Sequence, residues 1–62
     1  MEKSFTLKCE VINSETKQPV GFRVVTVYGE NGNSAVGRYS RVLKEEGLEL
    51  GESYSYSENR SL

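Results

Sequence analysis

Hydrophobic and polar residues alternate strictly near the start of the chain, over residues 5–11. Phe5, Leu7, Cys9 and Val11 share one parity, whereas the residues between them are polar or charged. A period of two is typical of a β-strand with one buried face. We therefore predict a strand here, in which Cys9 is a small core residue and not a reactive thiol.

A second β-prone run covers residues 20–28 and follows a polar loop that ends at Pro19. Its apolar residues fall on both parities: Val20, Phe22 and Val24 on one, Val25 and Val27 on the other. Either both faces of this strand are covered, as in a central strand, or a bulge shifts its register. The two strands are expected to pair as an antiparallel hairpin, with the position of the second in the sheet, central or edge, left open.

The segment 34–46 fits two structures. As a helix, it has an N-cap in Asn33 or Ser34 and a left-handed C′ residue in Gly47. Its apolar residues then form one stripe at helical spacing: Ala35, Val36, Tyr39, Val42 and Leu43. As a third strand, it would follow a tight turn at Asn31-Gly32. Alternation in the segment is poor, so the helix is favoured.

Alternation returns after Gly47. The even-numbered residues Leu48, Leu50, Tyr54 and Tyr56 are apolar or aromatic, with Gly51 placed for a bend or bulge between the two pairs. Residues 58–62 are expected to be a frayed tail. The predicted fold is a single small α+β domain, with a three-stranded antiparallel sheet and one helix in the order β-β-α-β. The predicted core is Phe5, Leu7, Cys9, Val11, Phe22, Val24, Val36, Tyr39, Leu43, Leu48 and Leu50.

Composition restricts how so short a chain is stabilised. With 62 residues, one cysteine and neither histidine nor aspartate, it has no intrachain disulfide and no plausible zinc set. Small domains without such supports depend on good packing or on a partner subunit, so a well-packed monomer and a homodimer or obligate partner are both left open. The sequence shows no secretory pattern and no apolar run of membrane-spanning length, which favours the cytoplasm.

The same composition argues against catalysis. Enzyme mechanisms need a poised acid, base, nucleophile or metal, and none of the nine glutamates lies in a recognisable motif. We therefore expect a non-enzymatic protein without a cofactor or a metal.

Charge is distributed unevenly along the chain. Residues 3–44 hold seven basic residues against three glutamates, whereas residues 45–62 hold five glutamates against one arginine. Acidic side chains beside tyrosines suit a basic surface on another protein, because tyrosine is a common interface anchor. The first hypothesis is a protein-binding module, such as a small inhibitor or adaptor from a compact phage-like genome. Its predicted contact residues are Glu45, Glu46, Glu49, Glu52, Tyr54 and Tyr56.

The alternative hypothesis is a dimeric DNA-binding regulator. Its predicted contact residues are Lys8, Lys17, Arg23, Arg38, Arg41 and Lys44. The segment 37–57 resembles swapped-hairpin regulators of the AbrB type in the positions of Gly37, Arg38, Gly47, Leu48, Gly51 and Glu52. The resemblance implies an intertwined DNA-binding dimer, although the proline before the family's helix is missing and the helical stretch is shorter. A third hypothesis is a structural subunit that assembles through exposed strand edges.

Overall fold

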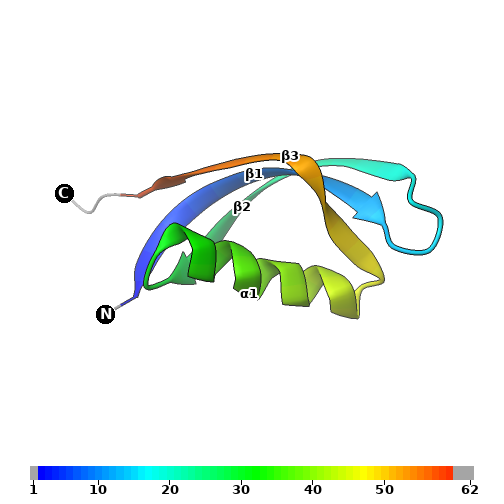
Figure 1. Ribbon diagram of the computed structural model, residues 1–62. Helices are drawn as coiled ribbons and strands as arrows, with labels where there is room; N and C mark the ends of the chain where they lie inside the picture. Colours follow the sequence, from blue (N-terminus) through cyan, green and yellow to red (C-terminus); the bar gives the residue numbers. More distant parts are fainter. Residues whose placement is uncertain (1, 60–62) are drawn as a thin grey trace.

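The computed structural model describes residues 2–59, which form one antiparallel sheet and one helix (Figure 1). Strand β1 spans Lys3–Asn13, β2 spans Pro19–Gly29, helix α1 spans Gly32–Glu45 and β3 spans Leu48–Glu58. The strand order is β2-β1-β3, and α1 packs on one face of the sheet. The predicted small α+β fold with the order β-β-α-β is thus confirmed. No element within residues 2–59 covers the opposite face, which we call the outer face of the sheet.

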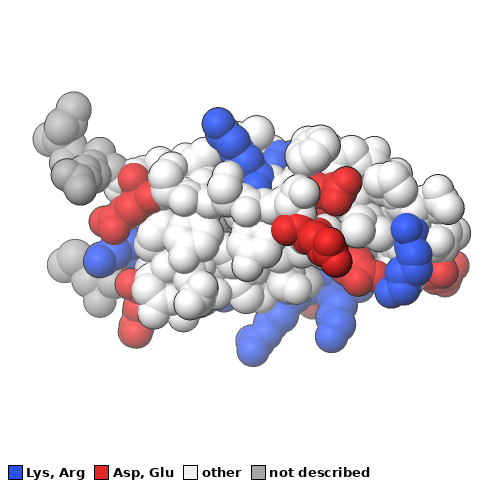
Figure 2. Space-filling view, turned by 45° about the horizontal axis from the view of Figure 1, so that its top comes forward, with Lys and Arg blue, Asp and Glu red and all other residues white. Residues whose placement is uncertain are grey.

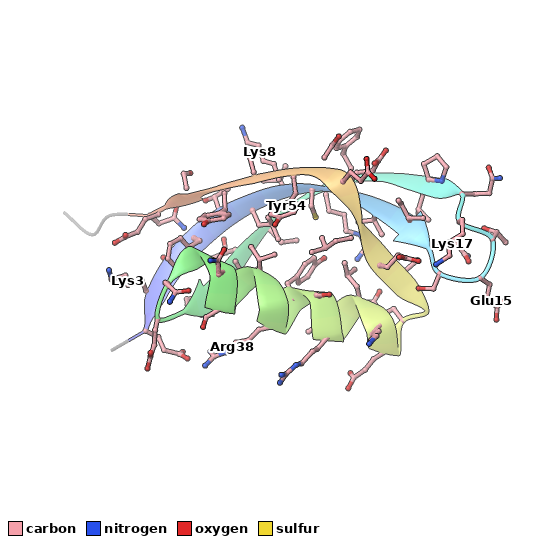
Figure 3. All side chains as sticks on the ribbon, viewed as in Figure 1. Lys3, Lys8, Glu15, Lys17, Arg38 and Tyr54 are labelled. Carbon is pink, nitrogen blue, oxygen red and sulfur yellow. The ribbon has the colours of Figure 1, made fainter. Side chains whose placement is uncertain are left out.

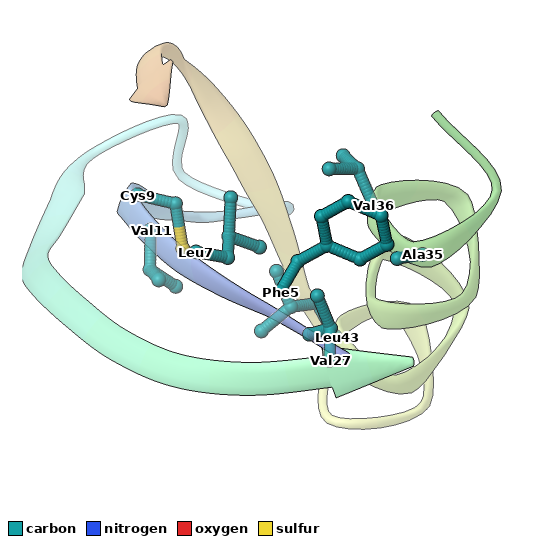
Figure 4. Packing of buried hydrophobic residues seen from close by; sticks show 8 residues of the cluster. All are labelled: Phe5, Leu7, Cys9, Val11, Val27, Ala35, Val36 and Leu43. Carbon is teal, nitrogen blue, oxygen red and sulfur yellow. The ribbon is translucent and has the colours of Figure 1, made fainter. Parts of the chain in front are cut away.

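The central strand β1 supplies half of the core. Its alternating residues Phe5, Leu7, Cys9 and Val11 point toward α1 and are at most 4% exposed. Buried residues from β2 and α1 complete the cluster in Figure 4, namely Val27, Ala35, Val36 and Leu43. Tyr39, Leu48 and Leu50, also predicted for the core, pack against this cluster and are partly buried.

Two core predictions in β2 are wrong. Phe22 and Val24 lie on the outer face and are 74% and 65% exposed. The pairing with β1 explains the difference, because Val25 lies opposite Leu7 and so takes the side of the sheet that α1 covers. The opposite parity of β2 therefore faces away from α1. This strand is at an edge of the sheet.

The β2 register also contains the bulge that the sequence allowed. Val11 pairs with Gly21, but the next residue of β1, Ile12, pairs with Pro19, so Val20 is the extra residue. The slip in alternation thus has two sources. A bulge occurs at the start of the strand, and apolar residues occupy both faces beyond it.

Residues 34–45 are helical, as favoured from the sequence, but the helix begins earlier and ends one residue sooner than predicted. Asn31 is the N-cap: its extended backbone precedes α1, and its side-chain oxygen accepts a hydrogen bond from the Ser34 backbone N–H at 2.9 Å. The predicted caps, Asn33 and Ser34, lie inside the first turn. At the other end Gly47 has φ of +77°, the left-handed conformation predicted for it.

Strand β3 has the bulge predicted at Gly51. Leu50 pairs with Val11 and Tyr54 pairs with Cys9, so residues 51–53 of β3 lie opposite one residue of β1, Glu10. The tyrosines keep the same side of the sheet as the leucines, as predicted. Of the expected tail, Glu58 is the last residue of β3 and the Asn59 N–H bonds to a backbone oxygen of β1. Residues 60–62 lie outside the described part.

Candidate functional site

The six residues of the first hypothesis follow one another along the end of α1 and the edge strand β3. We call Glu45, Glu46, Glu49, Glu52, Tyr54 and Tyr56 the acidic–tyrosine surface; within it, Glu49 lies on the outer face of the sheet and the two tyrosines lie on the side of α1. Glu45 ends α1, Glu46 is its C-cap and the others belong to β3. Figure 2 shows several acidic side chains close together on the face that it presents, with basic side chains toward its periphery. Because β3 has no neighbour beyond it among residues 2–59, this strand is accessible from the side.

Tyr56 differs from ordinary surface side chains in how its ring is held. The Tyr56 ring meets Phe5 edge to face, with centroids 5.9 Å apart and planes at 89°. It also lies directly over Gly32, where a Cβ would overlap the ring. Tyr56 nevertheless remains 42% exposed, and Tyr54 is 47% exposed. The Tyr56 ring is thus fixed at one edge and open to a partner at the other.

Two of the four carboxylates already have cationic partners. Glu49 accepts a bond from Lys17 at 2.6 Å, and Glu46 lies 3.7 Å from Arg23. Glu45 and Glu52 are exposed and have no ion-pair partner among residues 2–59. The uncompensated negative charge of this surface is therefore smaller than the sequence alone indicates.

Glu10, which the sequence analysis did not single out, lies beside this surface. Its side chain crosses the bulge, and a Cβ on Gly51 would lie 2.5 Å from the Glu10 Oε1. The neighbouring Glu52 is in the same bulge. No sequence signal indicates this proximity, because it arises from the register shift between β1 and β3.

Arg23 connects the sheet to the end of α1 and influences the one cysteine. Its Nη1 donates a hydrogen bond to the Tyr39 hydroxyl at 3.3 Å, and this bond, more than the nearby Glu46, raises the pKa of the guanidinium. Burial raises the pKa of the Cys9 thiol, and the charge of Arg23 opposes that shift. A buried neutral thiol is a poor nucleophile. Cys9 is a core residue in the structure.

The six cations of the alternative hypothesis do not share one face. Figure 3 shows Lys8 projecting from the outer face of the sheet and Arg38 projecting from the opposite side, beneath α1. Arg23 and Lys17 are engaged in the ion pairs described above. Arg38 and Arg41 do lie together and line a hollow on the exposed side of α1, although Arg38 also pairs with Glu2. The basic residues that converge are thus those of the helix.

A second surface, which the sequence analysis assigned partly to the core, lies along β2. Its apolar residues on the outer face are more than half exposed: Val20 56%, Phe22 74%, Val24 65% and Tyr28 55%. On the other side of the same edge, an open hollow of about 370 Å³ lies between β2 and α1 and is lined in part by Val27, Tyr39 and Val42. The signal was present in the sequence, as apolar residues on both parities.

Comparisons with family models, curated proteins and solved structures gave no match. In the part of the chain that the structure describes, no cluster of three or more acidic or cysteine side chains is arranged to hold a metal ion. Nor is the single described helix long and apolar enough to cross a membrane.

Proposed function

We propose that this chain is a non-enzymatic protein-binding module, an inhibitor or adaptor, that engages a basic partner through the acidic–tyrosine surface. The observation that carries the proposal is the state of Tyr56, which is anchored on Phe5 and yet 42% exposed. A ring that is already immobilised loses little conformational entropy when a partner covers it, so its burial contributes efficiently to affinity.

The chemistry of the surface favours arginine and lysine in the partner. Exposed carboxylates such as Glu52 attract cations and accept charge-assisted hydrogen bonds. The faces of Tyr54 and Tyr56 bind guanidinium groups by cation–π contact, which is worth about 0.5–1 kcal/mol at exposed sites. A partner of this kind would bind more weakly as salt is added, because rim charges are screened over a Debye length of about 10 Å at 0.1 M.

The test compares two double variants with the same change in net charge. In Glu45→Lys/Glu52→Lys, both substitutions lie in the acidic–tyrosine surface and break no ion pair among residues 2–59. In the control, Glu15→Lys/Glu30→Lys, both lie in exposed turns and neither belongs to that surface. Each immobilised protein is used to capture partners from lysate, and the captured proteins are quantified by mass spectrometry.

We expect basic proteins to bind the wild type and the control, and to bind the surface variant at least about tenfold less, a loss of about 1.4 kcal/mol. Circular dichroism shows whether each variant is folded. Equal capture by the two variants would contradict the proposal, because the charge change would then act without regard to position.

Nucleic acid is the second candidate, supported by the exposed position of Arg38, Arg41 and Lys44 on α1. Its test is fluorescence anisotropy with random duplex DNA between about 50 and 200 mM salt, where phosphate neutralisation gives a steep loss of affinity. Binding at low salt that Arg41→Glu abolishes would favour this candidate. With a net charge of −1 and Arg38 paired to Glu2, we expect no binding.

A further inference from the structure

The edge strand β2 lacks the features that keep sheet edges apart. Natural edge strands are protected by charged side chains, central prolines, strong bulges or short length. Strand β2 has 11 residues, its proline and bulge are at its very start, and its outer row is uncharged: Val20, Phe22, Val24, Thr26 and Tyr28. Its one charged side chain, Arg23, is on the side of α1 and is bonded to Tyr39. The strand is therefore open to pairing along most of its length.

The other edge of the same sheet provides an internal comparison. Strand β3 has a three-residue bulge in its middle, and the outward residues around and beyond it are polar, namely Glu49, Ser55 and Ser57. Both strands are of equal length and belong to one small sheet. Protection at one edge and its absence at the other make β2 the edge that is more open to pairing with another strand.

We propose that a second copy of this chain covers it, by antiparallel pairing of β2 with β2 about a two-fold axis at Val24. The two sheets would then join into one of six strands, with both helices on the same face. Val24 would lie opposite its own copy, and Val20 would lie opposite Tyr28 of the second copy. Val24 is the midpoint of the exposed row, so this register gives each of its apolar residues a neighbour across the axis.

Charge selects this register over its neighbours. An axis one residue earlier would place Arg23 opposite Arg23 of the second copy, and like charges directly opposite are destabilising. An axis one residue later would place Val20 opposite Glu30, which leaves an apolar side chain against a charge. One end of β2 lies near Lys17 and the other near Glu30, so the two ends of the strand carry opposite charges. Antiparallel pairing places the Lys17 end of one copy beside the Glu30 end of the other. A parallel arrangement would bring like charges together.

Apolar surface continues on the other side of the β2 edge. Val42 of α1 is 48% exposed, and with Val27 and Tyr39 it lines the hollow between β2 and α1. In the proposed dimer the two hollows face each other beneath the joined strands. Side chains of each copy can therefore enter the hollow of the other copy. Backbone pairing and apolar burial on both sides of a strand are what stable strand-addition interfaces combine.

This dimer is independent of the proposed function, because β3 and its tyrosines are at the opposite edge of the sheet and remain accessible. It would present two acidic–tyrosine surfaces, one at each end of the joined sheet. A failure of one idea therefore leaves the other intact, and the experiments for the two use different residues.

The first experiment is sedimentation equilibrium of the whole chain from about 1 to 500 µM, the range in which contacts of moderate size dissociate. We expect the wild type to reach twice the chain mass of 7.0 kDa. Val24→Lys should raise the dissociation constant at least tenfold, because it places two ammonium groups together at the axis. The control is Ser57→Lys, which adds the same charge to the outer face of β3 and should leave the dimer unchanged.

A second variant tests the register and does not depend on weakening the dimer. Val24→Cys places two thiols opposite each other at the axis, within disulfide distance, whereas Phe22→Cys separates its two thiols by several residues along the strands. Under mild oxidation we expect Val24→Cys to form covalent dimers at least tenfold faster than Phe22→Cys. A monomeric wild type at the highest concentration, a dimer that Val24→Lys leaves intact, or faster cross-linking by Phe22→Cys would each overturn the proposal.

Discussion

The Tyr56 ring occupies the space in which residue 32 would carry a Cβ, so the last strand and the first turn of α1 fit together only with glycine at position 32. We predict that Gly32→Ala destabilises the fold by about 1–2 kcal/mol, because the methyl group displaces Tyr56 from its edge-to-face contact with Phe5. Chemical denaturation measures this change.

The same contact gives a double-mutant test. In a Tyr56→Ala background the obstructing ring is gone, so Gly32→Ala should be neutral or slightly stabilising. An equal cost of Gly32→Ala in both backgrounds would show that the ring is not the cause.

Gly37 differs from Gly32 in the space that surrounds it. It lies in α1, is exposed, and a Cβ there would meet no atom within 4 Å. We predict that Gly37→Ala raises the free energy of unfolding by about 0.5–1 kcal/mol, since alanine favours a helix interior over glycine by about this amount. A rise in the thermal midpoint is the readout, and a fall would show that the glycine has a role the structure does not reveal.

The N-cap gives a third prediction. Asn31→Ala removes the acceptor for the Ser34 N–H and should cost about 1 kcal/mol. Asn33→Ala is the control, because Asn33 is exposed within the first turn and makes no capping bond. If the two variants were equally stable, the cap assignment would be wrong.

Cys9 gives a prediction about pH. Burial raises the pKa of its thiol in the folded state above the ordinary value of 9.0. Unfolded chains then lose the thiol proton at lower pH than folded ones, so the unfolded state binds fewer protons and stability falls as pH rises above about 9. Cys9→Ala should remove this part of the decline. The difference between the two proteins in urea midpoint, measured from pH 7 to pH 10, isolates the contribution of the thiol.

Thiol labelling offers a second measurement on the same residue. Because Cys9 has no exposed surface, we expect it to react with an aromatic disulfide reagent at neutral pH only as fast as the protein opens. Labelling at the rate of a free thiol in native conditions would contradict the burial described here.

Local patterns were sufficient to predict the element order and several turns. The alternation of Phe5, Leu7, Cys9 and Val11 gave the buried face of β1 directly, because β1 has one apolar parity. Gly47 and Gly51 were identified correctly because each stands where an adjoining pattern stops. These features are determined by residues close together in the chain, so they can be predicted from one sequence.

The faces of β2 could not be predicted in this way. Val24 and Val25 are equally suited to a core, and the choice between them depends on the pairing of Leu7 with Val25. That register involves residues far apart in the chain. The same limitation applies to the candidate sites, since the proximity of Glu10 to Gly51 and the separation of Lys8 from Arg38 both follow from tertiary structure.

The central position of β1 has a consequence for synthesis on the ribosome. β1 is the first strand to emerge, but its second neighbour, β3, begins 35 residues after β1 ends, at Leu48. At roughly 5–20 residues per second, one side of β1 stays unpaired for about two to seven seconds. During that interval its exposed hydrogen-bonding groups compete for any extended segment nearby. The nascent chain is thus most open to misassembly through β1 just before β3 closes the sheet.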